Sequence, residues 1–218
     1  ADERRRALQA LLAGAWRQRP ADAGPLSARL HAAGLLPEAR RAEAPALLDG
    51  NFDPRREAAA RRWSPDPAAE LSAVVGWRWP FLPGLDAQAV ETGDAAHPTA
   101  AFLAFDGSEA DQGLAAEQWL LARGGDRLAV TAWVRRLDAA DSGGLSLRLT
   151  RFDGTPVASL PLLPGDAWQP VAAQWAAPGQ GVETLRLQIV YQRLLGHMPL
   201  HNRILVTGLR LAPAGEAQ

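Results

Sequence analysis

Apolar and polar residues alternate with a period of two over most of the chain from Ala100 onward. The pattern is clearest in Arg127–Arg136. One side of this segment is uniformly aliphatic, with Leu128, Val130, Ala132 and Val134. The other side carries Thr131, Trp133 and Arg135. Because successive side chains of an extended strand point to opposite faces, this pattern predicts a strand with one buried and one solvated side.

Similar short segments follow one another, separated by glycine, proline and aspartate. They are Ala100–Asp106, Gly144–Phe152, Pro156–Leu163, Trp168–Ala176, Glu183–Arg193 and Arg203–Leu211. No helical pattern lies between them. Such a series predicts a mainly β protein, an antiparallel β-sandwich or jelly roll.

The first 45 residues follow a different pattern. In Asp2–Arg19 the apolar residues recur every three or four positions, which predicts a helix that Pro20 ends. A second helix is expected over Pro25–Ala33 with Gly34 as its stop, and a third over Pro37–Arg41. We therefore predict a helical segment over residues 1–45, a β domain over 46–213 and a tail over 214–218.

Composition excludes several classes of protein. Hydrophobic residues make up 47%, charged residues 22%, and the net charge is −1, as in an ordinary globular protein. Near-neutral charge argues against a nucleic-acid partner, which needs a concentrated basic surface. No apolar run approaches the ~20 residues of a membrane span. With 0 cysteines, disulfides and thiolate-bound zinc are excluded.

A set of landmarks in the β region resembles the CenC-like carbohydrate-binding modules. The landmarks are Leu48–Asp53, Trp77–Trp79, Ala101–Gly107, Gln118–Leu121, Leu128–Arg135, Trp168–Trp175 and Ile204–Leu211. The resemblance covers about residues 47–212 and implies a galactose-binding-like jelly roll that binds rather than catalyses. In that family, acidic residues of the last strand often serve a structural calcium. This chain has Thr207 and Gly208 there, so we assign no cofactor and keep a structural calcium only as an alternative.

The helical segment resembles the end of a tetratricopeptide array through Leu26–Gly34 followed by Glu38 and Ala39. Such a segment leading into this kind of sandwich resembles bacterial proteins linked to exopolysaccharide export. The resemblance implies a periplasmic, envelope or extracellular location and an envelope protein as a further partner. The chain begins at Ala1 and its one methionine is Met198, so we expect that an N-terminal region has been removed.

Trp133 is the leading candidate for ligand contact because it stands on a polar strand face with Arg135. If neighbouring strands add Arg148, Arg186 and Gln188, an aromatic platform is surrounded by planar hydrogen-bond donors. Sugars are recognised in this way, through stacking and fork-like donors. The alternative is that a loop or the helical segment covers Trp133 and the arginines are solvated. Trp77 and Trp79 are also candidate ligand residues, with packing as the favoured alternative.

Metal sites and catalytic groups have weaker sequence support. His197 and His201 lie four residues apart, but Pro199 prevents a regular helix from aligning them, so no metal is assigned. The loop with Asp106, Glu109 and Asp111 lacks the ligand spacing of a calcium loop. No nucleophile elbow and no pair of facing carboxylates is evident, so no catalytic residue is assigned.

These features predict a non-catalytic module that binds polysaccharide or another glycan. The alternative is a protein-interaction scaffold that uses the same fold and face. A glycoside hydrolase or lyase is a remote alternative, because distant carboxylates can converge in a fold.

Overall fold

The computed structural model describes residues 2–34, 47, 49–55, 58, 76–138, 144–193 and 201–213. Two helices come first, α1 (Asp2–Gln18) and α2 (Pro20–Ala32). The strands are β1 (Leu85–Glu91), β2 (Thr99–Asp106), β3 (Gln112–Arg123), β4 (Arg127–Arg136), β5 (Leu145–Arg151), β6 (Pro156–Pro161), β7 (Gln169–Ala176), β8 (Val182–Gln192) and β9 (His201–Pro213). Among these residues no helix is long and apolar enough to cross a membrane.

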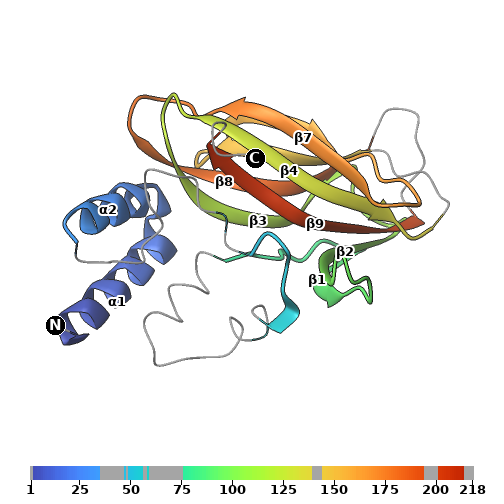
Figure 1. The fold of residues 1–218 in the computed structure, drawn as a ribbon, viewed down its shortest axis with the longest axis horizontal. Coiled ribbons are helices and arrows are strands. Elements are labelled where there is room, and N and C mark those ends of the chain that lie inside the picture. Colours follow the sequence, from blue (N-terminus) through green and yellow to red (C-terminus); the bar gives the residue numbers. More distant parts are fainter. Residues whose placement is uncertain are drawn as a thin grey trace.

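The described strands form two antiparallel sheets that pack as layers of a sandwich (Figure 1). The five-stranded sheet has the order β1-β2-β9-β4-β7, and the four-stranded sheet has the order β3-β8-β5-β6. Among these strands the chain changes sheet six times, at β2–β3, β3–β4, β4–β5, β6–β7, β7–β8 and β8–β9. The prediction of a mainly β, antiparallel sandwich of the jelly-roll type with an N-terminal helical segment is confirmed.

The core between the sheets is built from the aliphatic sides of the alternating strands. The inward residues of β4 are each at most 1% exposed: Leu128, Val130, Ala132 and Val134. The inward residues of β5 and β8 are equally buried: Leu145, Leu147, Leu149, Leu185, Leu187, Ile189 and Tyr191. Trp175 of β7 belongs to the same cluster. Two-sided alternation therefore located both the strands and their inner faces.

Two strands were not predicted, and each has a physical reason. β3 is buried on both faces over most of its length, because the helices cover part of its outer side. Trp119 and Leu121 therefore replace the polar residues that alternation requires. β1 does alternate, but two of its inward residues, Ala87 and Ala89, are small, and only Leu85 is a large apolar residue on that side, which gives a weak signal.

The helices agree with the predicted pattern except at the start of α2. This helix begins at Pro20 rather than Pro25, because the carbonyl of Arg19 accepts the amide of Ala23 at 3.1 Å and opens the first turn. Pro20 fits a first turn, where no amide partner is needed. Gly34 has the left-handed φ of 67° expected of a helix stop. The predicted helix Pro37–Arg41 lies outside the described residues.

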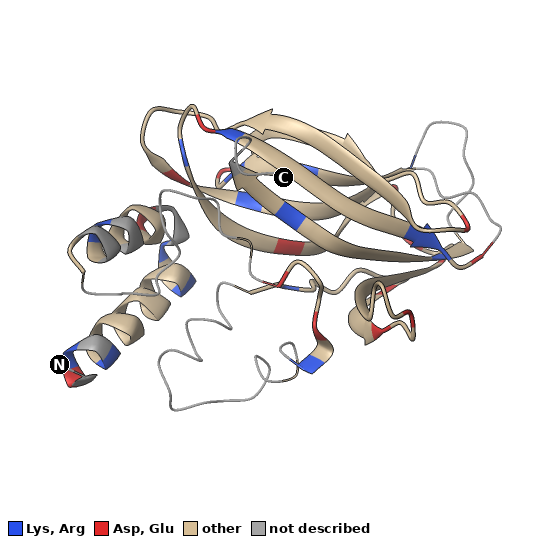
Figure 2. Cartoon of the chain, viewed as in Figure 1, with Lys and Arg blue, Asp and Glu red and all other residues tan. Residues whose placement is uncertain are grey.

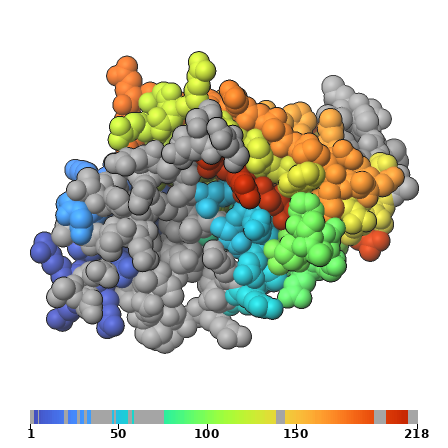
Figure 3. Space-filling view, in the orientation of Figure 1, coloured from blue at the N-terminus to red at the C-terminus, as the bar shows by residue number. Residues whose placement is uncertain are grey.

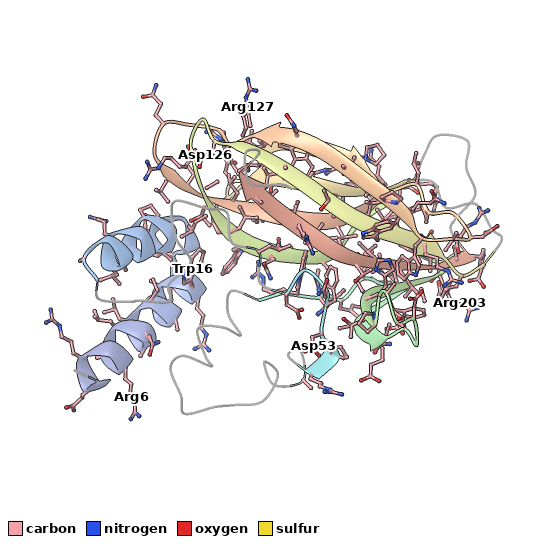
Figure 4. All side chains as sticks on the ribbon, in the orientation of Figure 1. Arg6, Trp16, Asp53, Asp126, Arg127 and Arg203 are labelled. Carbon is pink, nitrogen blue, oxygen red and sulfur yellow. The ribbon has the colours of Figure 1, made fainter. Side chains whose placement is uncertain are left out.

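The helices pack on the sandwich through a second, smaller apolar cluster. Its buried members are Leu12, Trp16, Ala23, Trp119 and Leu121. Trp16 lies at the end of α1 nearest the strands (Figure 4). A Cβ added to Gly24 would lie 2.2 Å from Thr184 Oγ1. The backbone of α2 at Gly24 therefore packs directly against the Thr184 side chain of β8.

The Asp49–Asp53 segment, part of the first landmark of the family resemblance, is a turn. Asp49 and Phe52 have φ values of 56° and 55°. The carbonyl of Gly50 accepts the amide of Leu209 at 2.8 Å, which fixes the turn to β9. Phe52 is 1% exposed and belongs to the main core.

Candidate functional site

The seven predicted ligand residues lie in three different places. Trp133 and Arg135 are on β4 of the five-stranded sheet, whereas Arg148, Arg186 and Gln188 are on β5 and β8 of the four-stranded sheet. The expected combination of Trp133 with these three polar side chains is therefore wrong. Alternation tells which side of a strand faces out, but the backbone pairing of β4 with β7 and β9 decides its sheet.

Arg148, Arg186 and Gln188 do form one surface, together with two residues that sequence analysis missed. We call this surface the guanidinium face: Arg78, Glu117, Arg148, Arg186 and Gln188. Strand pairing places Gln188 between Glu117 and Arg148. Arg78 joins the outer edge of β3, where its amide donates to the carbonyl of Glu117 at 2.8 Å.

Glu117 is the centre of the guanidinium face. Its carboxylate accepts a hydrogen bond from Arg78 Nη2 and another from Gln188 Nε2, the latter at 3.2 Å. Arg186 Nη1 lies 4.0 Å from Glu117 Oε2. The Glu117 side chain is only 11% exposed, so these contacts are partly shielded from water. One carboxylate is thus shared by two guanidinium groups.

Positive charge is in excess on this face. Burial lowers the pKa of Arg78, and the charge of Arg186 lowers it further, although Glu117 opposes both effects. Arg148 adds another guanidinium, whose Nη2 donates to Oε1 of the neutral Gln192 at 3.5 Å. Arg186 Nε is buried and has no hydrogen-bond partner among the described residues. The face can therefore accept an anionic group.

Trp119 lies beside these charges but offers no free ring. The guanidinium carbon of Arg78 is 3.8 Å from its ring centroid. Trp16 of α1 stacks on it at 5.5 Å with an interplanar angle of 17°. Since Trp119 is 7% exposed, it positions Arg78 and anchors α1 rather than forming a platform for a sugar.

Trp133 is exposed on the opposite sheet, and the helices do not cover it. Trp133 is 37% exposed, and its ring centroid lies 5.1 Å from that of His97. Arg135 shares its outward side of β4, as predicted. The Nε of Arg135 donates to the carbonyl of Asp166 at 3.0 Å.

Trp77 and Trp79 pack into the main core. Their rings lie 4.7 and 5.9 Å from that of Phe52. Trp77 Nε1 also donates to the carbonyl of Asp49 at 3.0 Å. Since both tryptophans face inward, the residue between them faces outward. That alternation was the available sequence signal for Arg78.

The described residues contain no group of three or more side chains typical of a metal site. In the acidic loop, Asp111 pairs with Arg193 at 2.8 Å, and Glu109 Oε2 accepts the amide of Gly107 at 3.1 Å. Asp106 accepts from the Ser108 hydroxyl at 2.7 Å. His197 lies outside the described residues. These acidic groups stabilise the loop itself.

Charged positions are distributed over both sheets and not gathered in one block (Figure 2). The guanidinium face is thus a local excess within a chain of net charge −1.

No family model and no curated protein matches the chain. Similar solved structures include a CBM4 module, with 12% identity, 64% of this chain and 87% of that chain covered, and a TM-score of 0.45. The CBM22-1 xylan-binding domain of Paenibacillus barcinonensis Xyn10C has 9% identity, with 71% and 90% covered and a TM-score of 0.41. The C-terminal family 22 module of Clostridium thermocellum Xyn10B has 13% identity, with 65% and 87% covered and a TM-score of 0.41. These three neighbours are carbohydrate-binding modules. At such identities, the assignment of the sandwich rests on this chain's own strand order and pairing.

Proposed function

We propose that this chain is a non-catalytic module that binds an acidic polysaccharide on its guanidinium face. The observation that carries the proposal is that Arg78 and Arg186 share the single carboxylate of Glu117, with Arg148 on the next strand beyond Gln188. The planar fork of arginine matches a carboxylate or sulfate in a bidentate manner. Because ion pairing and ring contact already hold Arg78 in place, less side-chain entropy is lost on binding.

A hydrolase or lyase is less well supported by this face. A glycosidase acid must hold a proton for the leaving oxygen. Glu117 instead contacts two guanidinium groups and an amide. These partners favour a carboxylate that organises a binding surface.

The cellular role belongs to the same proposal. The family resemblance suggests a CenC-like module in the bacterial envelope, working with exopolysaccharide export and an envelope protein partner. The helical hairpin would then be the end of a tetratricopeptide-like array. Genetic deletion tests this role: we expect loss of secreted acidic polysaccharide, restored by the wild-type gene but not by a gene encoding Arg186→Gln.

A protein-interaction scaffold is the second candidate, and one observation favours it. Trp16 of α1 already stacks on Trp119 at the edge of the guanidinium face, so this side of the sheet does pack against helices. A helical partner would extend that contact. Such a partner would bind through apolar groups and show little dependence on salt.

Titration with polygalacturonate and with a neutral glucan tests the proposal. We expect saturable, salt-sensitive binding of polygalacturonate, and a loss of about tenfold or more in Arg186→Gln, because a charge-assisted bond is removed. Arg127→Gln is the matched control, since Arg127 is an exposed arginine on the other sheet (Figure 4). Equal affinities of the Arg186→Gln variant and the wild type would overturn the assignment of this face.

A further inference from the structure

A second surface with polar side chains lies on the opposite side of the sandwich. We call it the indole row: Thr131 and Trp133 on β4, Gln174 on β7 and Arg210 on β9. In Figure 3 atoms of these three strands reach the visible surface, with β9 in red, β4 in yellow-green and β7 in orange. Nothing in the guanidinium face contributes to this row, because the two surfaces belong to different sheets.

Strand register places the members of the row along one line. Thr131 pairs with Arg210 across to β9 and with Ala172 across to β7. Trp133, two residues further along β4, points to the same side of the sheet as Thr131, so it follows the Thr131–Arg210 pair along β4. Gln174 pairs with Ala129, two residues on the other side of Thr131. An extended chain lying along β4 would meet these side chains in turn.

The Trp133 ring is held in place by the backbone beneath it, and its cross-strand neighbours have short side chains. A β-bulge between Thr131 and Trp133 and a φ of 57° at Gly208 bring the β9 backbone under the indole. A Cβ on Gly208 would lie 2.9 Å from Trp133 Cδ1, so glycine is required for this approach. The cross-strand partners of Trp133 are Pro170 and Thr207, which are short and leave the ring 37% exposed.

A chain of rings supports the indole from the side. His97 contacts Trp133 at 5.1 Å and Trp168 at 4.6 Å. Trp168 Nε1 in turn donates to Asp94 Oδ2 at 2.9 Å, which fixes the end of the chain. Trp133 is thus preorganised to present its ring to a ligand, at little cost in side-chain entropy.

The charge of the row selects the ligand. The outward positions of β4, β7 and β9 on the described sheet include Arg135 and Arg210 but no carboxylate. Arg210 forms no ion pair among the described residues. Exposed aromatic rings stack on the apolar face of a pyranose, and arginine binds its carboxylate.

We propose that the indole row is a second glycan site, in which a uronate-containing chain stacks a sugar ring on Trp133 and pairs its carboxylate with Arg210. The site stands independently of the guanidinium face. Together, two acidic-glycan sites on opposite sides of one sandwich would make the module bivalent, so that one molecule bridges two polysaccharide chains.

A bridging experiment separates the two sites. Polygalacturonate is immobilised, the protein is captured on it, and fluorescent polygalacturonate is then added. We expect the wild type to be captured and to recruit the second chain. Trp133→Ala and Arg210→Ala should still be captured through the guanidinium face but lose about tenfold or more of the recruited signal. Phe81→Ala is the control, because Phe81 is 90% exposed and belongs to neither surface.

Trp133→Phe keeps an aromatic ring and should restore part of the signal, which separates stacking from a defect in folding. Full recruitment by Trp133→Ala would overturn the proposal and indicate that bridging arises from self-association. If Arg186→Gln is captured normally while Trp133→Ala is not captured, the guanidinium face fails and the indole row stands. Capture of neither variant with full capture of the wild type would show that neither surface binds the chain by itself and would overturn the second-site proposal.

Discussion

Two glycines in the N-terminal helices have opposite surroundings and therefore opposite predicted effects. A Cβ on Gly24 would lie 2.2 Å from Thr184 Oγ1 and 2.6 Å from Leu121 Cδ2. Gly24→Ala should therefore lower the free energy of unfolding by about 1–3 kcal/mol, as overpacking does. Chemical denaturation followed by circular dichroism measures the change.

Gly14 of α1 is the matched control. Nothing lies within 4 Å of the position its Cβ would take. Gly14→Ala should stabilise the protein by about 0.5–1 kcal/mol, because alanine restricts the unfolded chain and favours a helix. A stabilising Gly24→Ala variant would show that the backbone of α2 does not pack directly against the Thr184 side chain of β8.

Glu117 links stability to binding in opposite directions. Glu117→Gln leaves Arg78 and Arg186 without their shared carboxylate, so we expect the free energy of unfolding to fall by about 1–3 kcal/mol. The same change removes the negative charge of the face, which raises its net charge by one, and should tighten polygalacturonate binding. Calorimetric titration and denaturation measure the two effects on one sample.

Glu91→Gln controls for the loss of a surface ion pair. Its carboxylate is 69% exposed and lies 3.7 Å from Arg55, so its removal should change stability by less than about 0.5 kcal/mol. Weaker polygalacturonate binding by Glu117→Gln would contradict the proposed role of the excess positive charge.

At the scale of elements, Asp94 organises the loop between β1 and β2. Its Oδ1 accepts the amide of Ala96 at 2.8 Å, while Oδ2 accepts Trp168 Nε1. The hydrogen bond from Trp168 lowers the pKa of Asp94, and the bond from Ala96 lowers it further. The ionised carboxylate therefore holds the loop that carries His97, whose ring lies beside Trp133.

The sign of the pH effect follows from this lowered pKa. The stabilisation is present above the unfolded pKa of about 3.9 and is lost as pH falls through the lower folded pKa. Other aspartates, such as Asp138 and Asp166, have pKa values lowered by arginine and also contribute to acid unfolding. Asp94→Asn should therefore reduce, not abolish, the loss of unfolding free energy between about pH 6 and about pH 3.

Denaturation at both pH values measures this difference. Asp86→Asn is the control, because its carboxylate accepts an exposed hydrogen bond from Gln88 at 3.1 Å, two residues along the same strand. Equal pH dependence in Asp94→Asn and the wild type would show that the loop does not depend on the ionised carboxylate.

At the scale of the whole molecule, the helices and the sandwich have separate apolar clusters. Among the described residues the cluster under the helices has five buried members, whereas the main cluster joins both sheets. Fewer buried contacts imply a lower free energy of local opening. We expect amides of α1 to exchange with deuterium before those of β4 and β8, and Trp16→Ala to accelerate exchange in the helices but not in β4.

Hydrogen exchange followed by mass spectrometry measures these rates by segment. Leu11→Ala is the control within α1, because Leu11 is 58% exposed and lies outside the cluster. Protection of α1 equal to that of β4 would contradict the separation and show a single cooperative unit.

The sequence by itself determined the fold class and the inner and outer sides of most strands. In β4 it placed Val130 inward and Trp133 outward, because an extended backbone turns successive side chains to opposite faces. It also located the helical segment and its stop at Gly34. These properties are local, so they follow from the order of neighbouring residues.

Only the tertiary structure decided which strands share a sheet. Backbone hydrogen bonds between strands do not depend on side-chain identity, so the pattern along β4 and β8 gave no sign that Trp133 and Arg186 lie on opposite faces. The contact between Arg78 and Glu117 joins positions 39 residues apart. Burial of β3 beneath Trp16 hid its alternation for the same reason. Long-range pairing and the packing of α1 assembled the guanidinium face and separated it from the indole row.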